Sequence, residues 1–500
     1  MSVTHRARRM GIDTGQEAVA YLHRDSPIVR SEGFNSQARV EVRAGERTIL
    51  ATLGVVGGDI LAPEEAGLSE AAWTRLGVTP DEYLTFAHPA PVESLSLVRG
   101  KIYGRALTAD GFLAIVRDIA AGRYSDIELA AFLAGCAGGR LTDREVVDLT
   151  LAMLGAGDRL SWPHTPVMDK HSVGGLPGNR TSIIIVPIVA AAGLLMPKTS
   201  SRAITSPAGT ADTMEMLAPV DLDVVRMRGV VEREGGCLVW GGRARLSPAD
   251  DVLIRVERPL DLDSPAQLVA SVLSKKAAAG ATHVVMDVPV GPTAKIRGAE
   301  EAAGLARLLC EVGRAVGLTV RPVLTQGTQP IGRGIGPALE ARDALAVLQR
   351  APSGPADLRD RSLLLAGHLL ELGGAAPPGA GEALARAILD DGRAERKFEA
   401  ICEAQGGRRI PPTAAFSRAV PSRKDGRVGV IDNRRLGRVA KLAGAPHDPA
   451  AGLELAVRLG DPVHRGDPLF TVYASALGEL EYGLGYATST PDIVTVADAP

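Results

Sequence analysis

An apolar run near the middle of the chain restricts the possible folds more than any other feature. The run reads IIIVPIVAAAGLLMP, from Ile183 to Pro197, and is interrupted by Pro187 and Gly193. A membrane-spanning helix needs about 20 consecutive apolar residues, so this run is too short to cross a bilayer. We therefore expect a helix that is buried inside a globular domain.

The size and composition of the chain indicate a soluble protein of several domains. At 500 residues the chain exceeds the roughly 250 to 300 residues at which a single core stops growing, so we expect two to four domains. Aromatic residues make up only 3% of the chain, which predicts aliphatic cores. The net charge of −2 gives no overall attraction for a polyanion, which disfavours binding to nucleic acid.

Two further patterns bear on where the protein works. The basic cluster Arg6 to Arg9 is not followed by an apolar stretch, so it does not read as a secretory signal. Cys136, Cys237, Cys310 and Cys402 lie far apart without a CxxC pair, which suggests neither a zinc site nor a disulfide framework. A reducing, cytoplasmic setting fits these patterns best.

An alternation of strands and helices begins near Trp162. THVVMDVPVG (Thr282 to Gly291) has the pattern of a buried strand, and GAEEAAGLARLLCEVG (Gly298 to Gly313) has that of a helix. Loops separate such segments repeatedly. This alternation is typical of an α/β domain with parallel strands.

The segments on either side have different patterns. Short β-like runs such as Ala38 to Val56 indicate a small separate module in the first 85 or so residues. Ser125 with Glu128, and Thr142 with Glu145, match the capping box at the start of a helix. From Pro421, short β-like runs separated by glycine and proline predict a final α+β domain.

A further helix interrupts the α/β pattern. Ser264 is its expected N-cap, Pro265 stands at the first helical position, Gln267 would complete a capping box, and Gly280 would end the helix. We assign this helix to the earlier helical region. The predicted division is therefore an N-terminal β-rich module (1–88), a discontinuous helical domain (89–162 and 246–281), an α/β phosphate-binding domain (163–245 and 282–415) and a C-terminal α+β domain (416–500).

The stretch MDKHSVGGLPGNRTS, just before the apolar run, has the composition of an anion site. Lys170 supplies a positive charge, Ser172 and Thr181 supply hydroxyl donors, and the helix that follows would present free N–H groups. A plain glycine-rich connector is the alternative. The pattern GxxxxGK[ST] is absent, so the stretch is not a Walker A loop. Close approach of the backbone to an anion would be permitted by Gly174, Gly175 and Gly178.

Two other groups of polar residues are candidates for the same site. The segment Lys198 to Leu217 carries many hydroxyls that could bind oxyanions, although a solvated serine-rich loop would look similar. On the helix after Ser264, Ser271 and Lys275 stand four residues apart and share one face, although a lysine on a helix is ordinarily solvated. The hydroxyl-bearing residues of the first group are Thr199, Ser200, Ser201, Thr205, Ser206 and Thr210, and the second group is flanked by Arg255, Asp263 and Lys295.

Four segments in this order resemble the thymidine and pyrimidine-nucleoside phosphorylase family: DKHSVGG, SSRAITSPAGTAD, ASVLSKKAAAGATHVVMDV and TQGTQPIGRGIGPALEARDAL. The resemblance covers the chain from about Leu97 to its end. SSRAITS and the N-terminal module are most similar to AMP phosphorylases and to the bacterial relatives known as type 2 thymidine phosphorylases. The resemblance implies a multidomain α/β fold with a small helical domain, a large α/β domain with a mixed or parallel sheet, and a C-terminal α+β domain.

The resemblance also implies roles for individual residues. In the thymidine phosphorylase pattern, His171 would lie near the glycosidic bond. The AMP phosphorylase pattern makes Asp263 the proton donor. Phosphate would be bound by Lys170, Ser172, Ser200 and Thr210, and the base by Arg255, Ser271 and Lys275. The nucleotide contacts of the AMP phosphorylase pattern would be Gly175, Ser201, Arg202, Ala203, Ile204, Thr205, Ser206, Thr210, Ser271 and Lys295.

One departure bears on the substrate. Where thymidine phosphorylases read GLGHTGGT, this chain reads AITSPAGT, which adds the hydroxyls of Thr205 and Ser206. Our hypothesis is that Ser201 to Ser206 binds the 5′-phosphate of a nucleoside monophosphate of the AMP, CMP or UMP type. The products would be the free base and ribose 1,5-bisphosphate.

Other functions stay open at this point. Thymidine phosphorolysis, giving thymine and 2-deoxyribose 1-phosphate, is the main alternative. A phosphoribosyltransferase, which would use a ribosyl pyrophosphate with Mg²⁺, and a non-enzymatic nucleotide sensor are less favoured. For the phosphorylase we expect no cofactor and no metal, with inorganic phosphate as co-substrate. We expect no nucleic-acid or membrane partner, and assembly into a homodimer or a larger homo-oligomer, as the resemblance implies.

Overall fold

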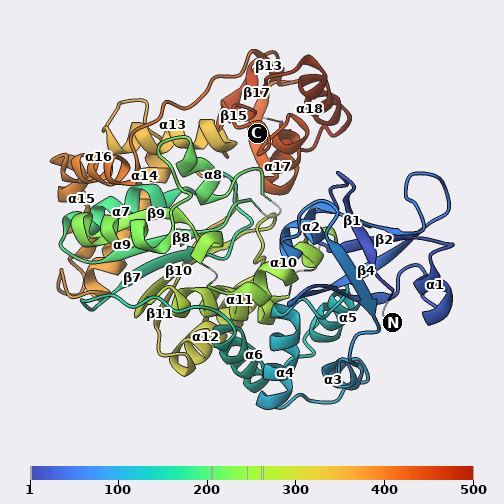
Figure 1. Ribbon diagram of the computed structural model, residues 1–500. Helices are drawn as coiled ribbons and strands as arrows, with labels where there is room; N and C mark the ends of the chain where they lie inside the picture. The colour runs from blue at the N-terminus through green and yellow to red at the C-terminus, as the bar shows by residue number, and fades with distance from the viewer. Residues whose placement is uncertain (1–2, 204–205, 245, 261, 263, 499–500) are drawn as a thin grey trace. The chain divides into compact units, whose positions relative to one another are not determined.

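Figure 1 shows the computed structural model of the chain. The structure describes residues 3–203, 206–244, 246–260, 262 and 264–498. The backbone contacts divide it into two compact units, Met1–Cys136 and Ala137–Pro500. The two units are described separately below. The finer four-domain division expected from the sequence stays a prediction.

The first unit begins with a closed β-barrel. Its strands are β1 (His5–Arg9), β2 (Val19–His23), β3 (Arg39–Ala44), β4 (Arg47–Val56), β5 (Glu65–Leu68) and β6 (Tyr83–Ala87), in the order β1-β5-β2-β4-β3-β6. Alternate residues point inward, as Val40 and Val42 of β3 show by being fully buried. The short helices α1 (Pro27–Glu32) and α2 (Glu70–Leu76) lie in its connections. The β-like run predicted at Ala38 to Val56 forms β3 and β4.

Three helices complete the first unit: α3 (Ser94–Ile102), α4 (Ala109–Ala120) and α5 (Asp126–Cys136). The capping box expected for α5 is present. The backbone N–H of Ser125 donates to Glu128 Oε2 at 2.7 Å, and the N–H of Glu128 donates to Ser125 Oγ at 3.4 Å. These bonds satisfy two N–H groups that the start of a helix leaves free.

The second unit is built around parallel strands. β7 (Met168–Ser172), β10 (His283–Val290) and β11 (Thr319–Gln326) form a parallel sheet in the order β11-β10-β7. β8 (Met196–Ser200) and β9 (Gly236–Trp240) form a parallel pair, and a bridge between Val167 and Leu195 joins the pair to β7. The predicted α/β domain with parallel strands is confirmed.

The apolar run forms the core of this unit, but only part of it is helical. α7 (Thr181–Ala191) is buried on nearly every side and packs against α14 (Ala356–Leu372) and α16 (Arg393–Gln405). The expectation that one helix reaches Pro197 is wrong, because Gly193 turns the chain with a positive φ of 85° and Met196 already belongs to β8. A buried strand and a buried helix have the same apolar composition, so periodicity alone did not separate them.

Among the remaining helices of the α/β region, α12 packs against β10 and β11, and α11 packs against α6 and α12. α11 starts at Pro265 as expected, but the side chain of Ser264 makes no capping hydrogen bond, so the predicted capping box is wrong. The proline itself suits this start, since its fixed φ is helical and it has no N–H to satisfy. The other elements are α6 (Asp143–Gly155), α8 (Thr210–Glu215), α9 (Val224–Glu234), the 3₁₀ turn Gly241–Ala244, α10 (Pro248–Leu260), α11 (Pro265–Ala278), α12 (Ala299–Ala315), β12 (Gly334–Ile335), α13 (Pro337–Leu348) and α15 (Gly381–Asp390). α6 begins with the predicted capping box of Thr142 and Glu145.

The end of the chain is the expected α+β region. β15 (Gly452–Leu455) and β17 (Pro468–Ala474) lie between β12 and β13 (Phe416–Pro421), and β14 (Gly426–Ile431) lies between β16 (Pro462–Val463) and β18 (Val494–Ala497). α17 (Asn433–Leu442) and α18 (Leu477–Ser489) pack beside them. Ile335 of β12 pairs with Leu453 of β15, which joins this region to the α/β part.

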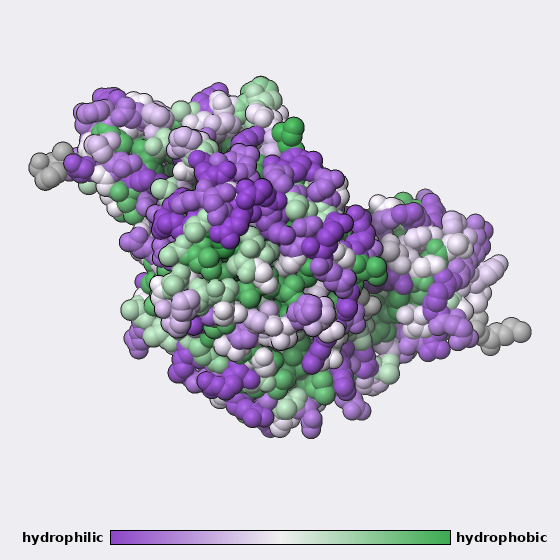
Figure 2. Space-filling view, turned by 90° about the vertical axis from the view of Figure 1, so that its left-hand side faces the viewer, coloured by the Kyte–Doolittle hydropathy of each residue, from purple (hydrophilic) through white to green (hydrophobic). Residues whose placement is uncertain are grey.

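Hydrophobic residues lie in small groups among hydrophilic ones on the face seen in Figure 2. Within the described ranges, none of the helices combines the length and the apolar character that a membrane span needs.

Candidate active site

Strand β7 places its side chains alternately on two faces, and both faces carry charge. Lys170 points toward the start of α7, where its Nζ donates to Thr181 Oγ1 at 2.7 Å. Asp169 points the other way, toward α11, where Lys276 Nζ lies 2.8 Å from its carboxylate. The strand therefore connects the glycine-rich loop to helix α11 through buried polar groups.

The glycine-rich loop after β7 runs close to two other segments. Gly178 has a φ of +74°, and a Cβ at this position would lie 1.9 Å from the carbonyl oxygen of Ile331. A Cβ on Gly175 would lie 2.4 Å from the backbone nitrogen of Lys295. Both glycines are needed because neighbouring protein segments come this close, whereas the expected close approach of an anion stays a prediction. Gly175 and Lys295, predicted as contacts of one ligand, lie against each other.

Lys170 is buried together with its hydrogen-bond partners. Its ammonium also lies 3.9 Å from the carboxylate of Asp287 on β10. Burial lowers the pKa of Lys170 to about 8, although the charge of Asp287 acts in the opposite direction. A lysine in this state still carries a positive charge at neutral pH and can bind an anion.

Two more predicted phosphate ligands lie at the end of strand β8 and at the start of α8. Ser200 ends the strand, and its Oγ is buried with no hydrogen-bond partner among the described residues. Thr210 begins α8 and is partly buried. The backbone N–H of Ala211 donates to the carbonyl oxygen of Ser201 at 3.4 Å, which brings the start of α8 back to the segment after β8.

Asp212 holds the hydroxyl-rich segment in a loop. Its Oδ2 accepts hydrogen bonds from the backbone N–H groups of Ala203 at 2.7 Å and Gly209 at 2.9 Å. Arg202, a predicted nucleotide contact, is paired with Asp212 at 3.2 Å and with Glu215 at 2.6 Å. Ile204 and Thr205, which were also predicted contacts, lie outside the described residues.

His171 lies near several lysines on the α11 side of β7. Burial lowers its pKa well below 6.5, and the charges of Lys276, Lys198, Lys170 and Lys275 lower it further. The imidazole is therefore neutral at neutral pH. In that state it can donate one hydrogen bond and accept another.

Asp169 connects three elements through two lysines that sequence reasoning missed. Lys198 of β8 lies 3.4 Å from one carboxylate oxygen, and Lys276 of α11 lies 2.8 Å from the other. Burial lowers the pKa of Lys198 to about 7. A signal existed, since a charged residue inside an apolar strand is rarely buried without a partner.

The predicted base contacts lie on α10 and α11. Lys275 forms an ion pair with Asp250 of α10. Burial works against the charge of Lys275, but Asp250 and other nearby carboxylates raise its pKa overall. Ser271 lies one turn earlier on α11 and Arg255 lies on α10. Asp263, the predicted proton donor, lies outside the described residues.

Asn179 and Asp287 were also missed by sequence reasoning. Asn179 Nδ2 donates to Asp287 Oδ2 at 2.8 Å and lies 3.2 Å from Ser172 Oγ. A polar residue in the glycine-rich loop and a carboxylate inside β10 were the visible signals. Their pairing depends on the sheet, which the sequence pattern alone does not place. Among the described residues, no group of histidine, cysteine, aspartate and glutamate is arranged to hold a metal ion.

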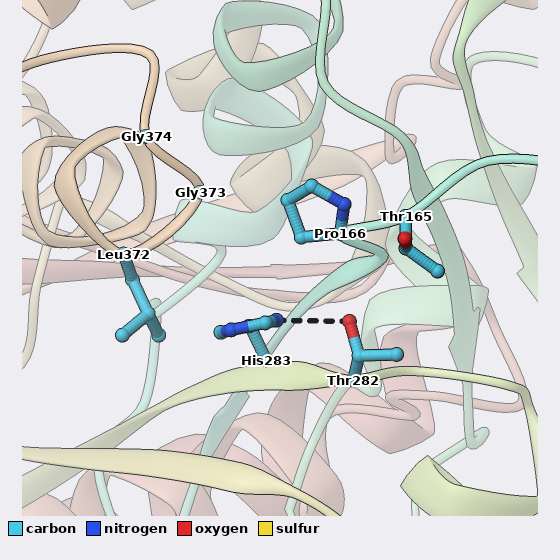
Figure 3. Close-up of a pocket in the computed structure, with 7 residues that line it drawn as sticks. All are labelled: Thr165, Pro166, Thr282, His283, Leu372, Gly373 and Gly374. Carbon is cyan, nitrogen blue, oxygen red and sulfur yellow. Dashed lines mark hydrogen bonds between the residues drawn. The ribbon is translucent and has the colours of Figure 1, made fainter.

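A hollow of about 550 Å³ lies elsewhere in the second unit. Figure 3 shows the side chains that line it. It is lined by Thr165, Pro166, Thr282, His283, Leu372, Gly373 and Gly374, and His283 Nδ1 lies 2.9 Å from Thr282 Oγ1. These residues adjoin the amino ends of β7 and β10, whereas Ser172 and the glycine-rich loop follow the carboxyl end of β7. Ligands of open α/β sheets bind outside the carboxyl ends of the strands. We therefore place the active site at the carboxyl ends.

Three family models match consecutive parts of the chain. They are the helical bundle domain of a glycosyl transferase family (residues 95–157), the α/β domain of the same family (164–395) and the C-terminal domain of pyrimidine nucleoside phosphorylases (427–483). Among solved structures, anthranilate phosphoribosyltransferase from Thermus thermophilus is similar with a TM-score of 0.51 and 22% identity, over 62% of this chain and 98% of that one. This likeness concerns the fold alone.

Two relatives match almost the whole chain. A protein of Polaromonas sp. strain JS666, named "Putative thymidine phosphorylase", is 63% identical over 99% of this chain and 96% of its own length. A protein of the same name from Legionella pneumophila strain Philadelphia 1 is 54% identical over 99% of this chain and 96% of its own length.

The fold and these matches define an enzyme, a pentosyltransferase that uses phosphate to cleave nucleosides. More particularly, the chain belongs to the thymidine and pyrimidine-nucleoside phosphorylase family.

Proposed function

We propose that the protein catalyses the reversible phosphorolysis of a nucleoside 5′-monophosphate of the AMP, CMP or UMP type. The products are the free base and ribose 1,5-bisphosphate. The observation that carries this proposal is the loop between β8 and α8. Asp212 draws its two ends together, and the side chains of Ser201 and Ser206 stay exposed on it. Exposed hydroxyls on a short closed loop suit the oxyanion of a 5′-phosphate. The Ser206 hydroxyl donates to the carbonyl oxygen of Ala208 at 2.8 Å and would turn from it to donate to that oxyanion.

A second phosphate, the attacking one, would bind beside the glycine-rich loop. We assign it to Lys170, Ser172, Ser200 and Thr210. The buried Oγ of Ser200, which lacks a partner among the described residues, supports this assignment. A buried polar group left unsatisfied costs about 1 to 3 kcal/mol, and a bound oxyanion would remove that cost.

Binding both substrates contributes much of the catalysis. Holding phosphate beside the anomeric carbon converts a bimolecular attack into a local one, worth up to about 7 to 11 kcal/mol in ideal cases. Positive charge develops on the sugar as the glycosidic bond breaks. A neutral His171 close to that bond can donate a hydrogen bond without adding a repulsive charge, and its lowered pKa keeps it in that form.

The leaving base also needs stabilisation. We propose that Asp263 donates a proton to it, and that Ser271, Lys275, Lys295 and Arg255 contact the base or nucleotide. The ion pair of Lys275 with Asp250 keeps the ammonium charged inside the protein. Its charge can then stabilise negative charge that accumulates on the base.

Thymidine is the second candidate substrate, and the names of the relatives favour it. It would be cleaved to thymine and 2-deoxyribose 1-phosphate with the same phosphate ligands. A phosphoribosyltransferase shares only the fold. Activity that survives EDTA would argue against that third possibility, because such an enzyme would use Mg²⁺.

The test is a set of assays with inorganic phosphate and matched substrates. Release of free base from AMP, CMP, UMP, adenosine, uridine and thymidine would be followed by chromatography, with and without phosphate. We expect the highest kcat/KM for a monophosphate. A higher kcat/KM for thymidine would contradict the proposal in favour of the second candidate.

Paired variants test the loop itself. Ser201→Ala and Ser206→Ala should raise KM for the monophosphate and leave KM for the matching nucleoside unchanged. Equal effects on both substrates would show that the loop does not bind the 5′-phosphate. We further propose a homodimer or larger homo-oligomer, which light scattering of the purified protein would test.

A further inference from the structure

Asp287 is a fully buried carboxylate at the centre of the parallel sheet. Its Oδ1 accepts a hydrogen bond from Thr325 Oγ1 at 2.6 Å, and its Oδ2 accepts one from Asn179 Nδ2 at 2.8 Å. Two cations stand farther away, Lys170 at 3.9 Å and Arg361 at 4.0 Å. In the register of the sheet Asp287 is the partner of Ser172, so both side chains lie on the same face.

The carboxylate fixes the orientation of the Asn179 side chain. A carboxylate can only accept hydrogen bonds, so the atom facing Asp287 must be the amide nitrogen. The same nitrogen lies 3.2 Å from Ser172 Oγ, and its second hydrogen is free for that contact. The Asn179 amide nitrogen therefore donates to both groups.

This arrangement sets the direction of the Ser172 hydroxyl. Since Ser172 Oγ accepts from Asn179, its own hydrogen is available to a different acceptor. Ser172 ends β7 where the glycine-rich loop begins, and it is only partly buried. An oxyanion bound beside that loop would receive this hydrogen.

The oxygen of the Asn179 amide is connected to Lys170 through Thr181. Thr181 Oγ1 accepts from Lys170 Nζ at 2.7 Å and lies 3.4 Å from Asn179 Oδ1, to which it can donate. The amide thus contacts both proposed phosphate ligands, Ser172 directly and Lys170 through Thr181. Asp287 is the group that decides which way this amide faces.

We infer that Asp287 and Asn179 are positioning residues for inorganic phosphate: they fix the Ser172 hydroxyl as a donor and hold the Lys170 ammonium beside it. Neither residue need touch the phosphate. The inference rests on the proposed phosphate site, because it presumes that Ser172 and Lys170 are ligands of the attacking anion.

A double-mutant cycle tests the inference in the full-length enzyme. Ser172→Ala should raise KM for phosphate about 10- to 100-fold, which corresponds to the loss of one hydrogen bond to an anion. Asn179→Ala should raise it by a similar factor and leave KM for the nucleoside or nucleotide within about twofold. When Asn179→Ala is added to Ser172→Ala, KM for phosphate should rise by a much smaller factor than Asn179→Ala causes alone. The reason is that the hydroxyl which Asn179 orients is already absent.

Thr325→Val is the matched control, since it removes the other hydrogen bond to Asp287 and leaves Asn179 in place. We expect it to keep KM for phosphate within about twofold. Circular dichroism and the thermal midpoint would verify the fold of each variant. If Asn179→Ala does not fold, Asp287→Asn replaces it, because an amide at 287 can turn its NH₂ toward Asn179 and reverse the Asn179 side chain. The same rise in KM for phosphate is then expected.

The outcomes distinguish failure of the proposed phosphate site from failure of the inferred positioning role of Asp287 and Asn179. No effect of Ser172→Ala would overturn the proposed phosphate site itself. An effect of Ser172→Ala without one of Asn179→Ala would leave the site standing and overturn the inference. Equal rises in KM for both substrates, or full additivity in the double variant, would show a merely structural role and also overturn it.

Discussion

Two lysine residues in this site differ in the direction of their pKa shift, and they also differ in their distance from the nearest carboxylate. Lys275 pairs directly with Asp250 and has a raised pKa, whereas Lys170 stands 3.9 Å from Asp287 and has a pKa lowered to about 8. Burial disfavours the charge of both. Lys170, the proposed phosphate ligand, therefore changes charge with pH in the range where enzymes are assayed, as does Lys198 with a pKa of about 7.

We predict that kcat/KM for phosphate falls as the pH rises through about 8. Lys170 is charged below its pKa and neutral above it, so the attraction for phosphate weakens on the alkaline side. Asp169, Asp287, Arg180 and Arg361 are the charged groups that act on it. Initial rates against phosphate concentration, corrected for phosphate ionisation, would measure the effect. The Lys170→Gln variant should be less active and should lack the fall in kcat/KM near pH 8. If the fall were unchanged in that variant, another group would be its cause.

The loop between β7 and α7 shows how one element places another. Gly178 lies against the carbonyl oxygen of Ile331, so the glycine-rich loop and the segment before β12 hold each other in position. Gly174 lies in the same loop with a similar φ of +93° but has open space around its would-be Cβ. The two glycines therefore separate the effect of backbone conformation from that of close packing.

Gly178→Ala should lower the stability of the second unit more than Gly174→Ala does. Both changes place an alanine in the left-handed backbone conformation, which costs about 1 to 2 kcal/mol. Gly178→Ala adds a clash with backbone, for which overpacking costs of about 1 to 3 kcal/mol are typical. Thermal denaturation would compare the two variants with the parent enzyme. Equal midpoints would show that the Ile331 contact does not restrict the loop.

The same loop shows how much the sequence could predict. Local signals sufficed for the start of α7 near Thr181 and for the two capping boxes at Ser125 and Thr142, because each depends on neighbours a few residues away. The end of α7 was missed, since an apolar composition fits helix and strand alike. Likewise, a sheet must first bring β7, β8 and β10 together before Asp169 meets Lys198 or Asp287 meets Asn179, and no local pattern encodes that.

At the scale of the whole molecule, the N-terminal barrel has a core of its own. Its buried side chains, among them Leu22, Val40 and Leu53, all come from residues 7–86. All six strands are paired on both sides because the barrel closes. Both properties are expected of a module that can fold without the rest of the chain.

We predict that a fragment of residues 1–88 folds by itself. It should have the circular dichroism of a β protein and unfold cooperatively on heating, because its core and its strand pairing are complete. Leu53→Ala, which empties a fully buried position, should destabilise it by about 2 to 5 kcal/mol. A fragment with no cooperative transition would show that the barrel depends on residues beyond it.

The closed barrel also bears on the order of events during synthesis. Its last strand, β6, ends at Ala87, so every backbone partner of the barrel leaves the ribosome before β7 does. The parallel sheet has to wait much longer, because β10 lies between β7 and β11, and β11 ends only at Gln326. Since domains generally fold as units while the chain grows, the barrel can finish before β11 exists. The nascent chain would then carry a completed barrel with no open strand edge. It would do so while the apolar helix α7 still lacks α14 and α16, the helices that pack against it.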